Sequence, residues 1–489
     1  MSEEQGKDIN TGVQEFHENP VEFMNRIPSK YDGEALDSSG ASMFDQAGIE
    51  QNTHVDARDG LRRQVTERDE VAVGRAAFAD NDEADGFVDE LRFSGLQSME
   101  ENGLMQAALE ESPWSDDYWA LYLGSLGKRY ADPNFPGSAD WKKNYDYIKQ
   151  YPAAEIVAQG NAEEINRLSP AEKYDILVGD IDYSLTRKMW EQGRKYYVRS
   201  GQVETWMGLC HGWAPASYML PRPTGTATVL AADGETYLTF YPADVKALST
   251  LLWAKVKCRS RFIGGRCNDK APAKDPETGR VLSPICFDTN PGTWHLAIVN
   301  QIGASRRSMV MDATYDYQVW NQPILSYSYR YFNPKTMYYV DSVTDARVAA
   351  GDFTNDKFAK FRSNETDSIV GIEMKVSYIV EKVPEHTETD SAADDQVKTV
   401  VYLYDLELDF AGNIIGGEWY QNAHPDFLWT PVQGDRLLTA AERHLTLDEN
   451  WQSGQPLAQQ WQQSASMAAE YEKAPLAAIV EQLIEFSNS

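Results

Sequence analysis

The chain has 489 residues, of which 75 are acidic and 45 basic, so its formal net charge at pH 7 is −30. This excess of negative charge argues against partners that are themselves polyanions, such as nucleic acids and anionic membranes. Hydrophobic residues make up 42% of the chain, yet none of its apolar runs reaches the roughly 18 residues that span a bilayer. We therefore expect no membrane span, and one large domain or two to three smaller ones.

The first 111 residues differ in composition from the rest. Residues 1–110 hold 25 acidic and 9 basic residues and contain neither Cys nor Trp. Such a composition is typical of a disordered or weakly packed region. We interpret residues 1–111 as an acidic N-terminal region, which is either a removable pro-segment of a zymogen or a solvated tail. The chain begins without the basic and apolar stretches of a secretion signal.

From residue 112 the chain becomes rich in aromatic residues, beginning with Pro113–Trp119. Farther on, Ser169 and Pro170 are typical of a helix start, because Ser caps the first turn and Pro fits the first helical position. We expect this helix and several others to precede residue 210. Residues 112–432 are predicted to form one central domain, and residues 433–489 a helical C-terminal tail.

Cys210 is the strongest candidate for a nucleophile. It precedes the stretch Trp213–Leu220, which is predicted to be a helix. That helix should begin near Trp213 or Ala214, because Pro215 does not fit deep inside a helix. Cys210 would then lie just ahead of the helix, where the positive end of the helix dipole favours its thiolate.

Other residues are candidates for the surroundings of this thiol. Backbone N–H groups near Cys210 would form an oxyanion hole, with Trp206 or Gln202 as side-chain donors. Trp206, Trp213 and Trp294 all lie within four residues of Cys210 or His295 in the sequence. Together they would form an apolar channel that keeps water from the reacting group. Core packing is the alternative for each tryptophan.

A predicted hairpin supplies the partners of the thiol. Residues 295–300 and 308–312 are short, apolar, β-prone runs separated by a loop of hairpin length. If the turn is centred midway between residues 303 and 304, His295 lies directly opposite Asp312. Opposed residues have Cβ atoms about 5 Å apart, so a carboxylate would orient the imidazole.

A Cys–His–Asp set of this kind converts a thiol into a nucleophile. Cys210, His295 and Asp312 are therefore the predicted catalytic residues. The alternative is that Cys210 is a small buried apolar residue and His295 a core histidine.

Strand patterns follow the predicted hairpin. Residues 372–380, 399–408 and 413–420 alternate between apolar and polar residues, which predicts an antiparallel meander in the same domain. Cys258, Cys267 and Cys286 allow one disulfide and one thiol, or no disulfide, and their pairing stays open. They lack the Cys-x2-Cys spacing of zinc sites, and the sequence identifies no metal ligands.

Three motifs resemble the transglutaminase elicitor family of oomycete cell-wall proteins and their bacterial relatives. They are Gly208–Trp213, Asn290–His295 and Tyr317–Pro323. The last contains Val-Trp-Asn-Gln-Pro, which matches the start of the family's elicitor peptide. The resemblance covers about residues 113–431. After Pro323 the chain departs from the elicitor peptide, so elicitor activity is not expected to follow.

The resemblance implies an α+β fold with a papain-like cysteine-enzyme core, in which helices precede the nucleophile and an antiparallel sheet carries the His and the Asp. It also implies a calcium-dependent protein-glutamine γ-glutamyltransferase with Cys210 as nucleophile. The partners would be protein substrates bearing Gln and Lys, and the location secreted or cell-surface. Two alternatives stay open: a cysteine peptidase or glutamine amidase with the same triad, and a non-catalytic surface recognition protein.

Overall fold

The computed structural model describes residues 8–27, 83–265, 271–283, 286–313, 319–445 and 451–489. The chain forms two compact units. Unit 1 contains the described residues up to Pro113, together with Arg259–Ile379 and Val397–Gln433. Unit 2 contains Trp114–Cys258, Val380–Gln396 and the described residues from Gly434 onward. Each unit is therefore built from segments that are distant in the sequence.

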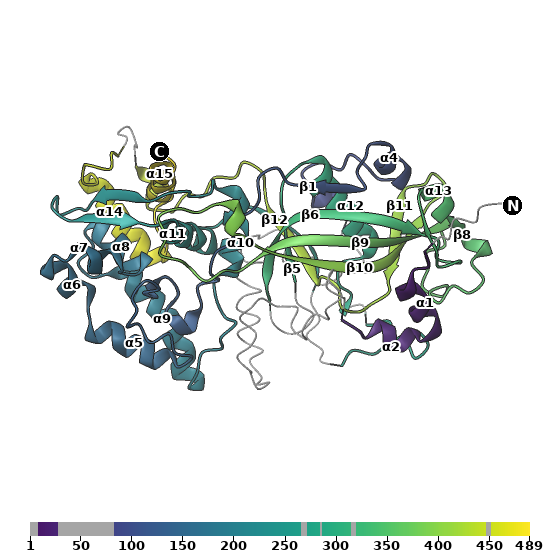
Figure 1. Ribbon diagram of the computed structural model, residues 1–489, viewed down its shortest axis with the longest axis horizontal. Coiled ribbons are helices and arrows are strands. Elements are labelled where there is room, and N and C mark those ends of the chain that lie inside the picture. Colours follow the sequence, from purple (N-terminus) through teal and green to yellow (C-terminus); the bar gives the residue numbers. More distant parts are fainter. Residues whose placement is uncertain (1–7, 28–82, 266–270, 284–285, 314–318, 446–450) are drawn as a thin grey trace. The chain divides into compact units, whose positions relative to one another are not determined.

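Unit 1 is built around an antiparallel sheet of ten strands, whose main path runs β11-β10-β9-β6-β5-β12-β4 (Figure 1). Short strands β1 and β7 pair with β6, and β8 pairs with β9. The strands are β1 Gln106–Ala108, β4 Ser260–Gly264, β5 Val310–Asp312, β6 Asn321–Phe332, β7 Tyr339–Val340, β8 Val348–Ala349, β9 Ser368–Val380, β10 Gln396–Leu408, β11 Ile414–Trp419 and β12 Phe427–Pro431.

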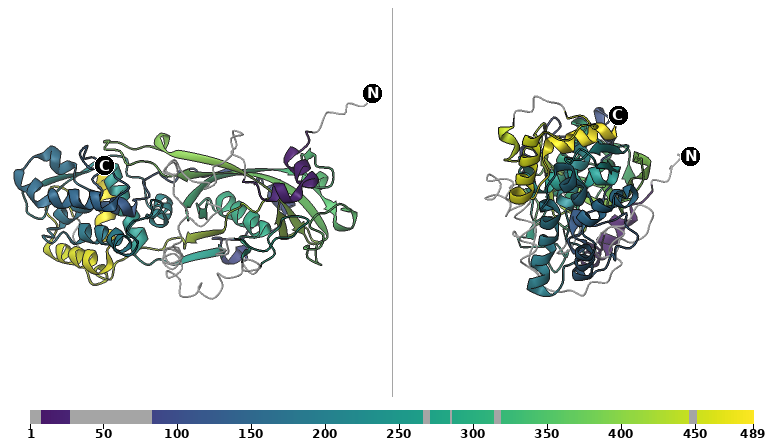
Figure 2. Two further views of the ribbon diagram at one scale, coloured as in Figure 1. Left: turned by 90° about the horizontal axis from the view of Figure 1, so that it is seen from below. Right: turned by 90° about the vertical axis from the view of Figure 1, so that its left-hand side faces the viewer.

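Helices of unit 1 pack on this sheet. Figure 2 shows the sheet curling around α12, which packs against β11. The helices are α1 Thr11–Glu18, α2 Pro20–Met24, α4 Leu96–Glu101, α12 Pro291–Ile298 and α13 Val343–Ala346, with a π-helix at Val299–Ala304. The fold is therefore mixed α+β with a large antiparallel sheet, as predicted. The predicted meander is confirmed, because β9, β10 and β11 are successive neighbours in the sheet.

The predicted hairpin that joins His295 to Asp312 is wrong. Residues 291–298 form helix α12, and only the second predicted strand exists, as β5. In the sheet Asp312 lies opposite Asn321 of β6. A short apolar run does not distinguish a strand from a buried helix. The deciding signals are Asn290, whose side chain caps α12 at Gly292 N, and Pro291 at the first helical position.

Unit 2 is largely helical. Its helices are α5 Trp141–Gln150, α6 Ala153–Gln159, α7 Ala162–Asn166, α8 Pro170–Val178, α9 Ser184–Ser200, α10 Cys210–Met219, α11 Pro242–Lys255, α14 Gln459–Met467 and α15 Ala477–Ser487, and its hairpin consists of β2 Ala227–Leu230 and β3 Tyr237–Phe240. The predicted start of α8 is confirmed, because Ser169 and Glu172 form a capping box with Pro170 at the first position.

The two ends of the chain are more closely packed than their composition indicates. Residues 83–113 contribute β1 to the sheet of unit 1, and Asp89 makes ion pairs with Arg307 and Arg261. At the other end, α15 packs against α11 of unit 2, and Leu476 N donates to the Tyr174 hydroxyl at 2.8 Å. The described residues at both ends therefore pack against the rest of their units.

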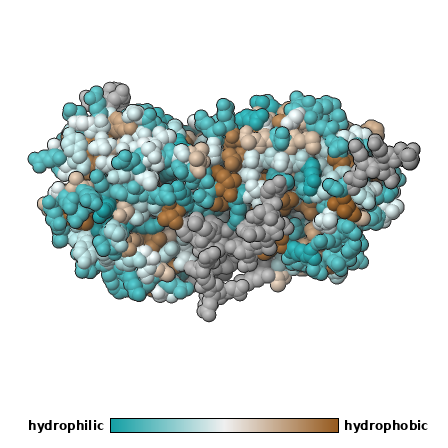
Figure 3. Space-filling view, in the orientation of Figure 1, coloured by the Kyte–Doolittle hydropathy of each residue, from teal (hydrophilic) through white to brown (hydrophobic). Residues whose placement is uncertain are grey.

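On the face shown in Figure 3, hydrophilic residues predominate over both units. Within the described part of the chain, no helix is long and apolar enough to cross a membrane.

Candidate functional site

Cys210 is the first residue of α10 and is 3% exposed. The helix begins about three residues earlier than predicted and includes Pro215 in its interior. Pro has no N–H to bond the carbonyl of the preceding turn, but the helix continues to Met219 because it is buried against α11. Cys210 is thus at the positive end of a ten-residue helix, where a thiolate is favoured.

Glycines on both sides of Cys210 fix its position. A Cβ on Gly208 would approach Tyr118 O to 2.3 Å, and a Cβ on Gly212 would approach Thr250 O to 2.2 Å. Both distances are far below van der Waals contact, so only glycine allows these close approaches. The Gly-Leu-Cys-His-Gly pattern therefore has a structural cause in unit 2, because it lets the start of α10 lie directly against its neighbours.

The segment Trp114–Trp119 supports this start of α10. Leu209 N donates to Tyr118 O, and the Trp213 indole N–H donates to Trp114 O at 2.9 Å. The Trp119 indole in turn donates to Asp116 Oδ2 at 2.8 Å. The sequence indicated only that this segment is aromatic, and its contacts with residues about 90 positions away carried no local signal.

Asp116 belongs to a buried charged cluster of unit 2. Burial raises the pKa of its carboxyl to about 7, opposed by the positive charge of Lys246. Lys246 Nζ donates to Ser115 O at 2.9 Å and pairs with Asp390 at 2.7 Å. Arg222 pairs with Asp390 and, at 2.6 Å, with Asp395. The cluster fixes the segment at residues 114–116, and sequence reasoning did not identify it.

The predicted oxyanion donors have other roles in the described contacts. The indole N–H of Trp206 donates to Glu204, and the Trp206 side chain is buried. Gln202 is an exposed residue of the loop after α9, and its carbonyl accepts from Ser200 Oγ at 3.0 Å. Trp213 is completely buried in unit 2.

His295 lies in the core of unit 1. It is completely buried on α12, and its Nδ1 is 2.8 Å from the hydroxyl of Tyr404 on β10. The ring of Tyr329 meets it edge-on at 4.7 Å. Burial lowers the pKa of His295 to about 3, so the imidazole is neutral near pH 7. Its Nε2 makes no hydrogen bond within the described residues.

Trp294, the neighbour of His295, packs in the same core. It is completely buried, with edge contacts to Tyr402 and Trp419. These contacts are those of a core side chain, so they give no support to a channel role in the described structure.

Asp312 is completely buried on β5, between β6 and β12. Its Oδ1 accepts from Trp320 N at 3.1 Å. The opposed Asn321 accepts from the Trp429 indole N–H at 2.7 Å. The Val-Trp-Asn-Gln-Pro motif therefore begins β6 and places a buried carboxylate, carboxamide and indole close together. Asn321 and Trp429 were missed because their proximity depends on the register of strands distant in the sequence.

The three predicted catalytic residues are thus divided between the units, with Cys210 in unit 2 and His295 and Asp312 in unit 1. Of the other cysteines, Cys286 is disulfide-bonded, whereas Cys258 is a buried thiol. Cys267 lies outside the described residues. In the part of the chain that the structure describes, no group of three or more His, Cys, Asp or Glu side chains is arranged to hold a metal ion.

The profile of the family described as transglutaminase elicitor matches residues 90–447. Among solved structures, the chain is similar to the GP42 transglutaminase from Phytophthora sojae, with 21% identity, a TM-score of 0.47, and coverage of 69% of this chain and 87% of that chain. No curated protein matches. Because the family match spans well over half of the sequence, the chain belongs to the transglutaminase elicitor family.

Proposed function

We propose that this protein is a protein-glutamine γ-glutamyltransferase with Cys210 as its nucleophile. The observation that carries the proposal is the position of Cys210 at the first residue of α10, inside a glycine-bounded motif, in a chain that belongs to the transglutaminase elicitor family. The helix N-terminus supplies both the field that favours a thiolate and backbone N–H groups for an oxyanion.

The reaction would proceed in two steps. The Cys210 thiolate attacks the γ-carboxamide carbon of a protein glutamine, the C–N bond breaks, and ammonia leaves with one added proton. A thioester remains on the enzyme. The amine of a protein lysine then attacks the thioester, loses a proton and releases the thiol. The product is an isopeptide bond between two proteins.

The roles predicted for His295, as the base, and for Asp312, as its orienting carboxylate, stay predictions. They depend on the geometry of the predicted hairpin, which is wrong, so the proposal for Cys210 does not include them. Transfer of a proton through His295 requires its Nε2, since Nδ1 is engaged with Tyr404. The role of His295 is therefore tested separately from that of Cys210.

Calcium has no step in this mechanism. The family resemblance implies it, but the described residues do not offer a matching cluster of ligands. Calcium therefore enters the assay as a variable condition. The proposed substrates are proteins that present Gln and Lys, and a cell-wall or cell-surface location follows from the family only.

Incorporation of a fluorescent primary amine into a glutamine-rich acceptor protein tests the proposal. We expect incorporation by the unaltered chain and none by Cys210→Ala. Cys258→Ala is the matched control, because it removes another buried thiol of unit 2 and should leave the rate unchanged. Ammonia or peptide release without amine incorporation would instead identify a hydrolase, and equal rates in both variants would exclude Cys210 as the nucleophile.

A further inference from the structure

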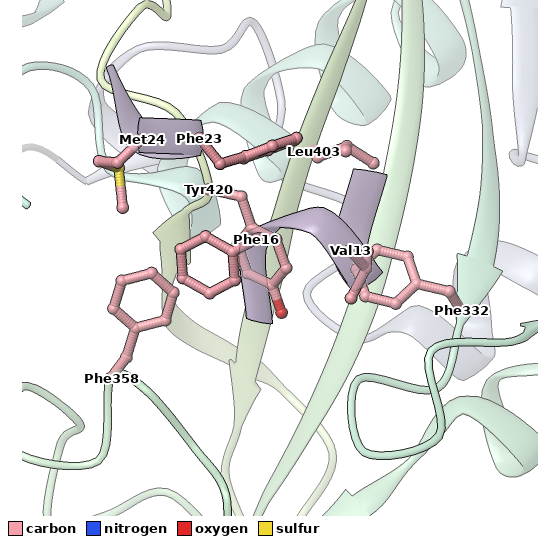
Figure 4. Close-up of a cluster of buried hydrophobic side chains, with 8 residues drawn as sticks. All are labelled: Val13, Phe16, Phe23, Met24, Phe332, Phe358, Leu403 and Tyr420. Carbon is pink, nitrogen blue, oxygen red and sulfur yellow. The ribbon is translucent and has the colours of Figure 1, made fainter. Parts of the chain in front are cut away.

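Residues 8–27 pack on unit 1 as two short helices. Val13 and Phe16 of α1, with Phe23 and Met24 of α2, are buried against Phe332, Phe358, Leu403 and Tyr420 (Figure 4). The ring of Phe16 stacks on those of Tyr420 and Phe358, with centroids 4.6 and 5.3 Å apart. Burial of four apolar side chains by one short segment is the main source of binding energy in such a contact.

Backbone hydrogen bonds hold the segment at both ends. At its start, Asn10 N donates to Met337 O at 2.7 Å, and Tyr339 N donates to Asp8 O at 3.1 Å. At its end, Asn422 N donates to Met24 O at 2.7 Å, and the Gln421 side chain donates to Arg26 O at 3.1 Å. These contacts fix the register and direction of the segment on unit 1.

The surface beneath the segment has the character of a peptide groove. Its floor is the cluster Phe332, Phe358, Leu403 and Tyr420, bordered by Met337, Tyr339 and Phe361. A contiguous apolar surface of this kind is rarely left uncovered. The outer face of the segment is polar, with Glu15, Glu18 and Glu22 in ion pairs or at the surface. This combination matches the recognition of an amphipathic helix by an apolar groove.

We propose that residues 8–27 are an intramolecular peptide ligand of the rest of unit 1. The groove binds this segment independently of the covalent connection to residue 83. Within the described residues, the segment contacts only the rest of unit 1, and it is joined to the remainder only through residues 28–82. A cut in that connection removes the high effective concentration of a tethered ligand, but it leaves every contact of the groove in place. The segment therefore stays bound after the cut. This inference does not depend on the chemistry at Cys210.

The first experiment uses the full chain with the recognition sequence of a site-specific protease inserted after Glu50. The folded protein is cut and passed over a size-exclusion column at micromolar concentration. We expect the fragment that ends at Glu50 to elute with the remainder of the chain. A fragment that elutes separately would overturn the proposal.

The second experiment measures sequence recognition in trans. A fluorescent synthetic peptide of residues 8–27 is exchanged into the cut protein, and unlabelled variant peptides compete with it. Phe16→Ala should compete at least about 100-fold more weakly, since truncation of a buried Phe is among the costliest changes. Val13→Ala should compete about tenfold more weakly. The variants are made in the peptide, so no altered protein has to fold.

Val21→Ala is the matched control. It removes the same two methyl groups as Val13→Ala, but Val21 is 41% exposed whereas Val13 is completely buried. Its affinity should change by less than about twofold. If all three variant peptides compete equally, or if the unaltered peptide does not compete, the groove does not recognise this segment.

Discussion

The substitution Gly212→Ala tests how the fold positions the nucleophile. A Cβ at this position would lie 2.2 Å from Thr250 O and 2.6 Å from Ala254 Cβ of α11. Ordinary contact begins near 3.4 Å, so the start of α10 would have to move from α11 by roughly 1 Å. Overpacking of this kind costs about 1–3 kcal/mol, and replacing Gly by Ala in a helix returns about 1 kcal/mol, so the net cost reaches about 2 kcal/mol.

Two measurements follow from that displacement. The thermal midpoint of unit 2 should fall by up to about 8 °C, because the net cost reaches about 2 kcal/mol and 1 kcal/mol corresponds to about 2–4 °C for a unit of this size. Amine incorporation should fall by about 100-fold, since a shift of about 1 Å at a reacting group has effects of that order. Circular dichroism and the fluorescent-amine assay give these values.

Gly454→Ala is the control, because no atom lies within 4 Å of a Cβ at that position of unit 2. It should leave both stability and activity unchanged. If Gly212→Ala were also unchanged in both, the account of the glycines beside Cys210 would be refuted.

Two further substitutions probe the half of the candidate site in unit 1. Between pH 7 and pH 5, His295 should lower the free energy of unfolding by about 2 kcal/mol, because burial lowers its pKa in the folded state to about 3. In urea titrations at these two pH values, His295→Gln should therefore lose about 2 kcal/mol less than the unaltered chain. As pH falls below about 6.5 the unfolded histidine takes up a proton that the folded one refuses, so its contribution is destabilising. If His295 also serves as the base, this variant loses amine incorporation while it remains folded. An unaltered pH dependence would contradict its burial as a neutral imidazole. Trp429→Phe removes the donor to Asn321 and should cost about 1–3 kcal/mol, because it leaves a buried acceptor without its partner. A variant with unaltered urea unfolding would contradict the importance of that hydrogen bond.

The elements that were predicted correctly are those with strong local signals. Ser169, Pro170 and Glu172 specify the start of α8 within a single turn. The strands of the meander show clear alternation over many residues, and neighbouring strands in the sequence also pair in the sheet. In these cases local chemistry and tertiary structure favour the same result.

The errors occur where burial overrides the local pattern. Most residues of α12 are buried, so the hydrophobic pattern of the run that contains His295 does not distinguish one helix face from the other. Pro215 is accommodated within α10 because that helix is buried against α11. The pairing of Asn321 with Trp429 depends on a strand order that no local pattern reveals.

The central claim is that Cys210 forms a thioester with a glutamine substrate. Incubation of the full chain with a glutamine-containing peptide, in the absence of any acceptor amine, followed by intact-mass and peptide-level mass spectrometry, tests it most directly. The account predicts an adduct on Cys210 with the mass of the peptide less one ammonia, which is discharged when a lysine analogue is added. An adduct on Cys258 instead, or none on the unaltered chain while amine incorporation proceeds, would contradict it.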